Sequence, residues 1–415
     1  MRRVVVTGMG AVSPIGNTAV ETWENMVAGK NGINYITRFD TSDYKVKIAA
    51  EVKDFDPLKY MTKSELGRTD LFCQYAMSAA CEAVEDSGLD VEKVDSTKFG
   101  VYVGSGTGGM ITYTEEMKKL MDRGPRRVSP FFIPKMIGNM AAGQIAVRFG
   151  CNGATLPVVT ACATSTNAIG EAYRAIKHGY ADVIIAGGSE AAIVPLAVAG
   201  FTNCQALTET ENIEEASIPF DKRRNGFVMG EGAGILILED YEHAINRNAY
   251  IYGEIAGYGN TCDGYHMTAP DPEATYSSLA IKDALKEAGY FSEKIDPQRV
   301  YVNAHGTSTP LNDKTETVAI KKAFGENEAK KLHVSSTKSM TGHMLGAAGA
   351  IEAIAALKAI EKNIIPPTIN YLEKDDECDL DITPNKAVVT EIDLAISTSL
   401  GFGGHNGCIA FKAVR

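Results

Sequence analysis

The strongest constraint on the fold of this chain is a repeat within its own sequence. The segment Ala83–Gly88 and the acidic turn after it return as Ala284–Gly289 with a similar turn. Each copy leads into a Val-Tyr-Val strand and then a glycine-containing loop. Similarity in this order indicates duplicated structural units. It predicts two related α/β halves, roughly 1–250 and 251–415.

A weaker part of the repeat concerns two turns that precede helices. A strand enters a turn at Cys162 in the first half, and a comparable turn holds His343 in the second. Aligning the glutamates of the two following helices places Cys162 opposite His343. A later strand, after Asp182, matches one after Asp393. The strands are almost continuously apolar, which is typical of sheets covered on both faces, and their end loops should share one cleft.

Composition excludes several classes of function. The formal net charge is −11, which argues against general nucleic-acid binding because that needs a basic face. The most apolar stretch, Val183 to Phe201, is interrupted by Glu190 and Pro195 and is a poor candidate for a membrane span. We therefore expect neither a nucleic-acid partner nor a membrane partner.

The cysteines indicate the cellular setting. Eight cysteines show no CxxC pair and no Cys/His cluster with zinc spacing, so we expect no metal site of that kind. The N-terminal apolar run is too short for a signal peptide. Thiols in a reducing cytoplasm are the resulting expectation.

Three residues stand where chemistry is most plausible. Cys162 lies where a strand turns into a helix, so the helix dipole should favour its thiolate and free backbone N–H groups should surround it. His305 and His343 follow strands in loops of small residues. Each alone has an ordinary structural explanation, such as a core thiol or a capping imidazole. Their placement in loops of the repeated units predicts that they converge.

Two glycine-rich loops need separate interpretation. Gly401–Asn406 follows the last long strand and places one phenyl ring among three glycines, which predicts a mobile loop with exposed N–H groups, although an ordinary tight turn would look similar. Gly104–Gly109 formally fits GxGxxG, but no long helix clearly opens at its last glycine and no acidic residue follows at the required distance. We interpret it as a sharp turn that lets another subunit or domain approach.

Several long motifs, in order along nearly the whole chain, resemble a known family. The chain resembles the elongating β-ketoacyl-acyl-carrier-protein synthases of the thiolase superfamily, and looks closest to the type II synthases of bacterial fatty-acid synthesis. The motifs that carry the resemblance are Val4–Gly8, Gly124–Phe132, Thr160–Ser165, Pro219–Asp221, Gly226–Ala233, Asn303–Thr309, Lys338–His343 and Gly401–Gly404. The resemblance implies an α/β thiolase-like fold, with two pseudo-repeated halves packed as five layers (αβαβα).

The resemblance also implies a mechanism. Cys162 would carry the acyl chain, and its N–H with that of Phe402 would form the oxyanion hole. His305 and His343, neutral and protonated on Nε2, would stabilise the enolate formed when malonyl thioester loses CO₂. Lys338 would donate to a histidine Nδ1, with Glu352 holding the lysine. The product would be a β-ketoacyl chain on the carrier protein.

Further roles implied by the resemblance concern substrate and partner. Phe402 and Asp263 would gate the site. The residues implied in substrate binding are Thr307, Thr309, Thr107 and Phe201. Thr107, small for its place at the floor of the partner subunit's acyl pocket, leaves chain length open. The chain should form a homodimer, dock an acidic acyl carrier protein and need no cofactor of its own, since phosphopantetheine arrives on the carrier. A structural monovalent cation is possible. Basic candidates for docking are Lys63, Arg68, Arg126 and Arg127.

Alternatives remain at this point. A priming synthase or a thiolase fits less well, because His343 stands where the priming enzyme has asparagine and Cys408 lies beyond the Gly-Phe-Gly-Gly loop. A polyketide-type ketosynthase uses the same residues. An inactive acyl-binding subunit of the chain-length-factor type would lack the nucleophile, which is present here. A nucleotide-binding dehydrogenase rests only on the weak glycine pattern.

Overall fold

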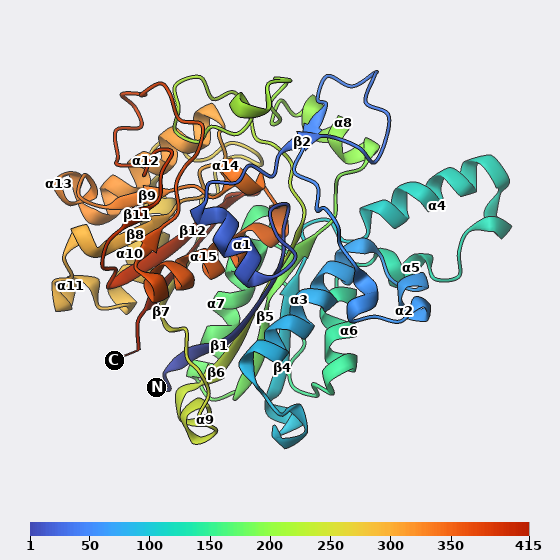
Figure 1. The fold of residues 1–415 in the computed structure, drawn as a ribbon, viewed down its shortest axis with the longest axis horizontal. Coiled ribbons are helices and arrows are strands. Elements are labelled where there is room, and N and C mark those ends of the chain that lie inside the picture. Colours follow the sequence, from blue (N-terminus) through green and yellow to red (C-terminus); the bar gives the residue numbers. More distant parts are fainter. Residues whose placement is uncertain (415) are drawn as a thin grey trace.

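The computed structural model describes residues 1–414, and its main element is one large sheet (Figure 1). Within those residues the sheet has nine strands in the order β4-β5-β6-β1-β7-β13-β12-β8-β9. The strands are β1 (Val4–Val12), β4 (Phe99–Gly104), β5 (Val183–Glu190), β6 (Gly232–Asp240), β7 (Gly253–Cys262), β8 (Val300–Asn303), β9 (His333–Ser335), β12 (Leu394–Gly401) and β13 (His405–Lys412). Two short ribbons pair β2 (Asn34–Tyr35) with β3 (Ile48–Ala49) and β10 (Ile364–Ile365) with β11 (Val388–Val389).

The strand order is mirrored about the contact between β1 and β7. From the edge inwards, β4 runs parallel to β5, which pairs antiparallel with β6, which pairs antiparallel with β1. In the same way β8 runs parallel to β12, β12 pairs antiparallel with β13, and β13 pairs antiparallel with β7. The two half-sheets join only where Val5 and Val6 of β1 pair with Glu254 and Gly253. The two halves that the sequence repeat predicted therefore share the same order and direction of strands.

Helices complete a five-layer arrangement. The central helices α7 (Thr164–Lys177) and α15 (Ala348–Lys362) pack on each other, with α7 against β4 and β5 and α15 against β12. Outside, α3 (Leu71–Ser87) covers β1 and β6, while α10 (Thr275–Glu287) covers β7 and β13. The small residues of α15, buried from Ala348 to Ile360, allow this close packing. The expected αβαβα fold is confirmed.

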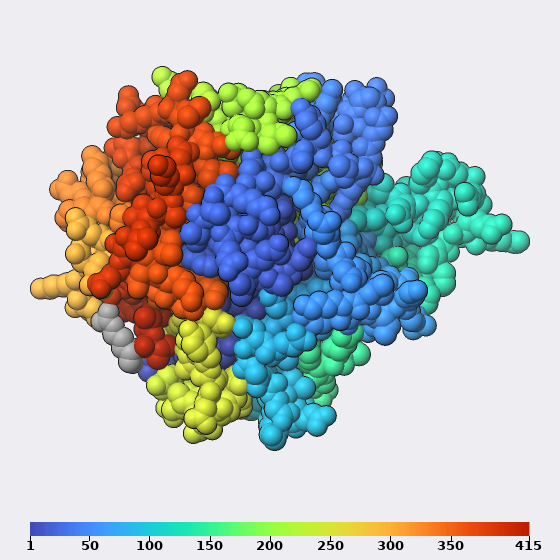
Figure 2. All heavy atoms as spheres, viewed as in Figure 1, coloured from blue at the N-terminus to red at the C-terminus, as the bar shows by residue number. Residues whose placement is uncertain are grey.

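The remaining helices lie around this core. They are α1 (Ala19–Val27), α2 (Lys63–Gly67), α4 (Met110–Arg123), α5 (Phe132–Met136), α6 (Met140–Phe149), α8 (Pro195–Asn203), α9 (Tyr241–Asn246), α11 (Tyr290–Glu293), α12 (Pro310–Phe324), α13 (Glu326–Ala329) and α14 (Lys338–Thr341). Helix α4 projects from the body, and the space-filling view shows it as a lobe at one side (Figures 1 and 2). No helix in residues 1–414 has the length and hydropathy needed to cross a membrane.

The structure corrects the predicted alignment of the two turns. Single helical turns, 161–163 and 345–347, lead into α7 and α15, and each begins with a left-handed residue, Ala161 (φ 51°) and Leu345 (φ 48°). Cys162 is therefore equivalent to Gly346, not to His343. The alignment on glutamates failed because Glu171 is the eighth residue of α7 whereas Glu352 is the fifth of α15, so that His343 lies three residues before the equivalent position.

The register of β4 and β8 is also two residues from the one suggested by the Val-Tyr-Val motifs. The sheet pairs Phe99 with Val183 in the first half and Val300 with Leu394 in the second. Since the strands after Asp182 and Asp393 do correspond, Phe99 matches Val300. His305, five residues further on, then matches Gly104.

Candidate active site

Cys162 lies in the tight turn that starts α7. The preceding residue, Ala161, is left-handed, a conformation that costs an alanine about 1–2 kcal/mol and that turns the chain sharply. Gly401, at the end of β12, comes so close that a Cβ there would lie 3.2 Å from the Cys162 nitrogen and 2.7 Å from the Thr160 oxygen. The turn is therefore held against β12 by backbone contact that only glycine permits.

Burial governs the Cys162 thiol. Desolvation raises its pKa to about 12, while the charge of Lys338 and a hydrogen bond from the Phe402 N–H lower it only in part. Burial therefore opposes the thiolate that the helix N-terminus was expected to favour. The N–H of Phe402 nevertheless points at the sulfur, where the predicted oxyanion hole requires it.

The two histidines lie together, deep in the same site. Their ring centroids are 5.2 Å apart and the rings are nearly perpendicular, at 89°. Both side chains are almost completely buried, and desolvation followed by the charge of Lys338 lowers the pKa of each well below 6.5. The imidazoles are therefore neutral. The backbone fixes His343, whose N–H donates to the Val228 oxygen at 2.7 Å, and Phe227 packs edge-on against its ring at 5.2 Å.

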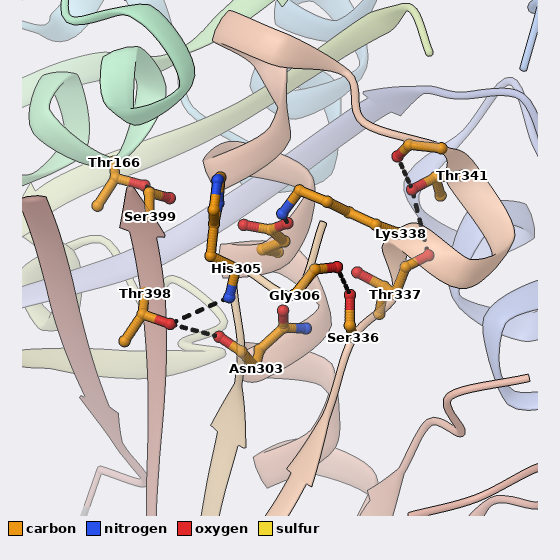
Figure 3. Close-up of polar contacts among 12 residues, drawn as sticks. Thr166, Asn303, His305, Gly306, Ser336, Thr337, Lys338, Thr341, Thr398 and Ser399 are labelled. Carbon is orange, nitrogen blue, oxygen red and sulfur yellow. Dashed lines mark hydrogen bonds and ion pairs between the residues drawn. The ribbon is translucent and has the colours of Figure 1, made fainter. Parts of the chain in front are cut away.

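Lys338 does not make the predicted hydrogen bond to a histidine. Its amino group binds the Glu352 carboxylate, and both side chains are buried. Nδ1 of His305 and of His343 has no partner among residues 1–414. A buried ammonium takes a carboxylate in preference to an imidazole, because only the carboxylate neutralises its charge. Glu352 thus holds Lys338 as expected, while the lysine acts on the histidines through its field, and its side chain extends towards His305 in Figure 3.

The His305 loop is fixed from below by a carboxylate that the sequence did not reveal. Glu316, on α12, accepts the backbone N–H groups of His305 and Gly306, each at 2.7 Å. Thr398 donates to the same carboxylate at 2.7 Å. Its hydroxyl oxygen also accepts the His305 N–H at 3.2 Å (Figure 3). The backbone of His305 is thereby immobilised while its ring faces the cavity.

The predicted gating residues lie on two connected loops. Asp263 accepts a hydrogen bond from Asn406 at 2.7 Å, and its own N–H donates to the Gly404 oxygen at 2.8 Å. The Gly403 N–H donates to the Met267 oxygen at 2.8 Å. A movement of the Phe402 loop therefore has to displace the loop that carries Asp263.

A cavity of about 420 Å³ joins most of the predicted site residues. Those that line it are Cys162, Phe201, Asp263, His305, Thr307, Thr309, His343 and Phe402. Phe201 and Phe402 face each other with centroids 6.5 Å apart, and the hydroxyls of Thr307 and Thr309 are 3.0 Å apart. An apolar wall near the sulfur and hydroxyls further along suit a thioester on a polar arm.

Other predicted residues lie away from this cavity. Thr107 is exposed and its hydroxyl donates to Glu190 at 2.6 Å. Lys63 and Arg68 lie on and just after α2, where the Arg68 guanidinium lies 5.5 Å from the Phe131 ring. Arg126 and Arg127 lie in the segment that returns from α4 to α5. These basic residues are on the outer surface.

Sequence reasoning missed Glu190 and Glu316. Glu190 ends a strand that is otherwise apolar, and a charge in such a strand was a signal that could have been followed. Glu316 lies in a helix with polar residues on several sides, and nothing in its spacing distinguishes it from its neighbours.

A turn-borne cysteine beside two neutral histidines, at the meeting point of two related α/β halves, is the arrangement of a thiolase-like condensing enzyme. The chain belongs to the β-ketoacyl synthase family. The family model of the N-terminal domain matches residues 1–244, and that of the C-terminal domain matches residues 252–372.

Known proteins support this assignment over the full chain. A 3-oxoacyl-[acyl-carrier-protein] synthase 2 of Staphylococcus aureus (strain COL) is 52% identical over 412 residues, 99% of this chain and 98% of the relative. The structure of the ishigamide ketosynthase/chain length factor is 35% identical with a TM-score of 0.92, covering 100% of both chains. A ketosynthase solved with its type II polyketide acyl-carrier protein is also 35% identical, with a TM-score of 0.89 and 100% coverage of both chains.

Proposed function

We propose that this chain catalyses the decarboxylating condensation of malonyl-acyl carrier protein with an acyl chain held on Cys162, in fatty-acid elongation. One observation carries the proposal: Cys162, two neutral histidines and the Phe402 N–H lie around a single cavity. The 3-oxoacyl synthase relatives at about half identity support the choice of substrate.

The first half-reaction loads the enzyme. The Cys162 sulfur attacks an acyl thioester, the bond to the carrier thiol breaks, and the acyl chain becomes a thioester of Cys162. Because burial raises the pKa of the thiol to about 12, its proton leaves as the new bond forms, and the released carrier thiol takes it up overall. The oxyanion of the tetrahedral intermediate would lie against the N–H groups of Cys162 and Phe402.

The second half-reaction extends the chain. The bond between the malonyl methylene and its carboxylate breaks, CO₂ leaves, and the electron pair forms an enolate. Nε2–H groups of His305 and His343 would stabilise the enolate oxygen, which neutral imidazoles can do without giving up a proton. The enolate carbon then attacks the acyl carbonyl, the bond to the Cys162 sulfur breaks, and the departing thiolate takes up one proton from solvent to restore the thiol.

Separating the two half-reactions tests the proposal. Cys162→Ala should abolish acyl transfer and keep malonyl decarboxylation, whereas His343→Ala should lose decarboxylation. Cys151→Ala, which removes a buried thiol of another core cluster, is the control and should retain both. Condensation by Cys162→Ala would contradict the mechanism. If the wild-type chain decarboxylates malonyl thioester but transfers no acyl chain, the result would instead favour an inactive acyl-binding subunit.

Carrier docking is the part of the proposal that concerns the surface. A ketosynthase relative is known in complex with an acyl-carrier protein, which supports a carrier as partner. We place its docking site on Lys63, Arg68, Arg126 and Arg127. Reversing the charge of Arg126 and Arg127 to Glu should raise KM for carrier-bound substrate roughly tenfold or more while sparing small thioesters. Lys282→Glu with Lys286→Glu, on the outer face of α10, is the charge-matched control, and equal effects on both substrates would exclude this site.

A homodimer completes the proposed assembly. The segment after Thr155 pairs with β4 on one side only, and exposes Leu156 and Val159 along this edge of the sheet. An exposed apolar edge is a natural place for a second strand. Pairing with a second copy would also bring the exposed Thr107 close to the partner. Val159→Lys should shift the sedimentation coefficient of the chain towards that of a monomer, and an unchanged dimer would exclude this edge.

We extend the proposal to a structural monovalent cation. Among the buried oxygens of residues 1–414 that have no hydrogen-bond partner are Asn303 Oδ1, Ser397 Oγ and Glu352 Oε2. Asn303 and Ser397 are paired across β8 and β12, against which α15 with Glu352 packs. Oxygen donors of this kind suit a hard cation. We propose that they hold one, and expect K⁺ or Na⁺ to raise Tm above that in N-methylglucamine chloride at equal ionic strength; equal Tm values would refute it.

A further inference from the structure

Glu190 is a buried carboxylate for which the proposed mechanism has no use. It ends β5, has no exposed surface and does not line the cavity. A carboxylate in this position needs a reason, because burying it costs several kcal/mol unless hydrogen bonds compensate.

Five hydrogen bonds converge on this carboxylate. Oε1 accepts from the Ser105 hydroxyl at 2.9 Å, from the Thr107 N–H at 3.1 Å and from the Thr107 hydroxyl at 2.6 Å. Oε2 accepts from the N–H of Gly106 at 2.9 Å and of Gly346 at 3.0 Å. Three of the donors are backbone N–H groups, which can only donate, so the site is built for an acceptor on both oxygens. The glycine-rich loop therefore wraps an internal anion, not a phosphate.

The Gly346 contact links Glu190 to the nucleophile. Gly346 is the equivalent of Cys162 in the second half, and the turns 161–163 and 345–347 pack against each other. A Cβ on Gly346 would lie 2.5 Å from the Gly106 nitrogen and 2.7 Å from Glu190 Oε2, so the turn is pressed onto the carboxylate. Fixing this turn fixes the surface against which the Cys162 turn lies.

We infer that Glu190 is a positioning residue for condensation: its carboxylate anchors the 345–347 turn beneath the Cys162 turn and places a negative charge beside the nucleophile. The inference rests on the proposed function, in which Cys162 is acylated. The charged groups that act on the thiol agree with this geometry. Lys338 lowers the pKa of Cys162, while Glu190 and Glu352 raise it.

Two substitutions separate charge from geometry. Glu190→Gln removes the charge and must turn an amide NH₂ towards N–H donors, whichever way the amide lies. Glu190→Asp keeps the charge but is one methylene too short to reach all five donors. Glu82→Gln is the control, since Glu82 is also buried, accepts the N–H groups of Ala11 and Ala19, and lies on α3, in the outer helix layer.

The experiment follows iodoacetamide alkylation of Cys162 by mass spectrometry from pH 6 to 11, together with kcat and KM for condensation. Glu190→Gln should shift the alkylation profile to lower pH, by about one pKa unit or roughly tenfold in rate at fixed pH. Glu190→Asp should keep the wild-type profile yet lose roughly tenfold in kcat, with KM nearly unchanged. Glu82→Gln should lower Tm and leave the profile in place.

The outcomes are distinguishable. A Glu190→Gln profile that superimposes on the wild type, or a wild-type kcat in Glu190→Asp, overturns this inference. If Glu190→Gln does not fold, the Asp variant decides alone. If alkylation of Cys162 in the wild type leaves condensation intact, the proposed function itself fails, whatever the Glu190 variants do.

Discussion

The turn at Cys162 and the turn at Gly346 occupy equivalent places in the two halves, yet only one of them is open to a substrate. Both start with a left-handed residue and lead into a central helix. The strand end beside Cys162 is Gly401, which lines the cavity and has no side chain that could accept the N–H groups of that turn. The equivalent strand end in the first half is Glu190, whose carboxylate accepts the Gly346 N–H.

The same backbone turn thus serves two purposes in the two halves. A backbone N–H at the start of a central helix binds a negative oxygen in both halves: the internal carboxylate at Gly346, and by our proposal the substrate oxyanion at Cys162. The same contrast separates His305 from its counterpart Gly104, where a Cβ would lie 2.1 Å from the Val158 oxygen. The strand ends of the first half are thus packed against neighbouring chain, whereas those of the second half, Gly401 and His305, line the cavity.

The largest expected effect comes from closing the open turn. Gly401→Ala would place a methyl group 2.7 Å from the Thr160 oxygen and displace the Cys162 N–H from the oxyanion. We expect kcat to fall about 10²–10³-fold, the loss typical of one oxyanion-hole donor. Stopped-flow acylation by an activated thioester measures it. Gly143→Ala, in α6 with nothing within 4 Å of the added methyl, should keep full activity; an equally active Gly401→Ala would contradict the close contact.

Crowding the filled turn should instead cost stability. Gly346→Ala forces a methyl group against the Gly106 nitrogen and Glu190, so we expect the free energy of unfolding to fall by about 3 kcal/mol. Urea denaturation followed by circular dichroism gives the value. The Gly143→Ala control should gain up to about 1 kcal/mol, since alanine favours a helix. A neutral Gly346→Ala would contradict the close packing of this turn on Gly106 and Glu190.

Charge provides the next contrast, because the second half keeps its histidines neutral. Burial lowers the pKa of His305 and His343 well below 6.5, so malonyl decarboxylation should not decline as the pH falls through 6.5. Unfolded histidines bind protons below that pH and folded ones do not. The free energy of unfolding should therefore decrease as the pH falls, by up to about 1.4 kcal/mol per histidine per pH unit.

The measurement is a decarboxylation profile and a set of denaturation curves between pH 5 and 8. His305→Gln removes one of the two groups and should reduce the slope of stability against pH. A decarboxylation rate that halves near pH 6.5 would show that an imidazole titrates there and would contradict the neutral pair.

The sequence predicted those features of the fold and the site that follow from the order and spacing of residue types, and missed those set by contacts in three dimensions. Continuous apolar strands, small-residue helices and repeated turns identified the layers, and the loops after strands identified Cys162, His305 and His343. The alignment of Cys162 with His343 was wrong because the glutamates used for it lie at different distances from the starts of α7 and α15, which the sequence does not show. The desolvation that opposes the Cys162 thiolate was not predicted, since it depends on what covers the residue. Glu190 and Glu316 were missed because most of their partners are backbone N–H groups, which leave no trace in side-chain patterns.

The smallest expected effect compares the hydroxyls that bind the two carboxylates. Thr398→Val removes a buried donor to Glu316 and should lower the free energy of unfolding by about 1 kcal/mol, with a modest loss of decarboxylation as the His305 backbone loosens. Thr107→Val removes an equally short bond to Glu190, but its side chain is exposed in the single chain and water can replace the donor. It should therefore cost less in a monomer and approach the Thr398 value only where a partner subunit excludes water. Denaturation of both variants, alone and combined with the monomerising Val159→Lys, tests this. If Thr398→Val and Thr107→Val lower the free energy of unfolding equally, with or without Val159→Lys, then access of water does not distinguish the Glu190 site from the Glu316 site.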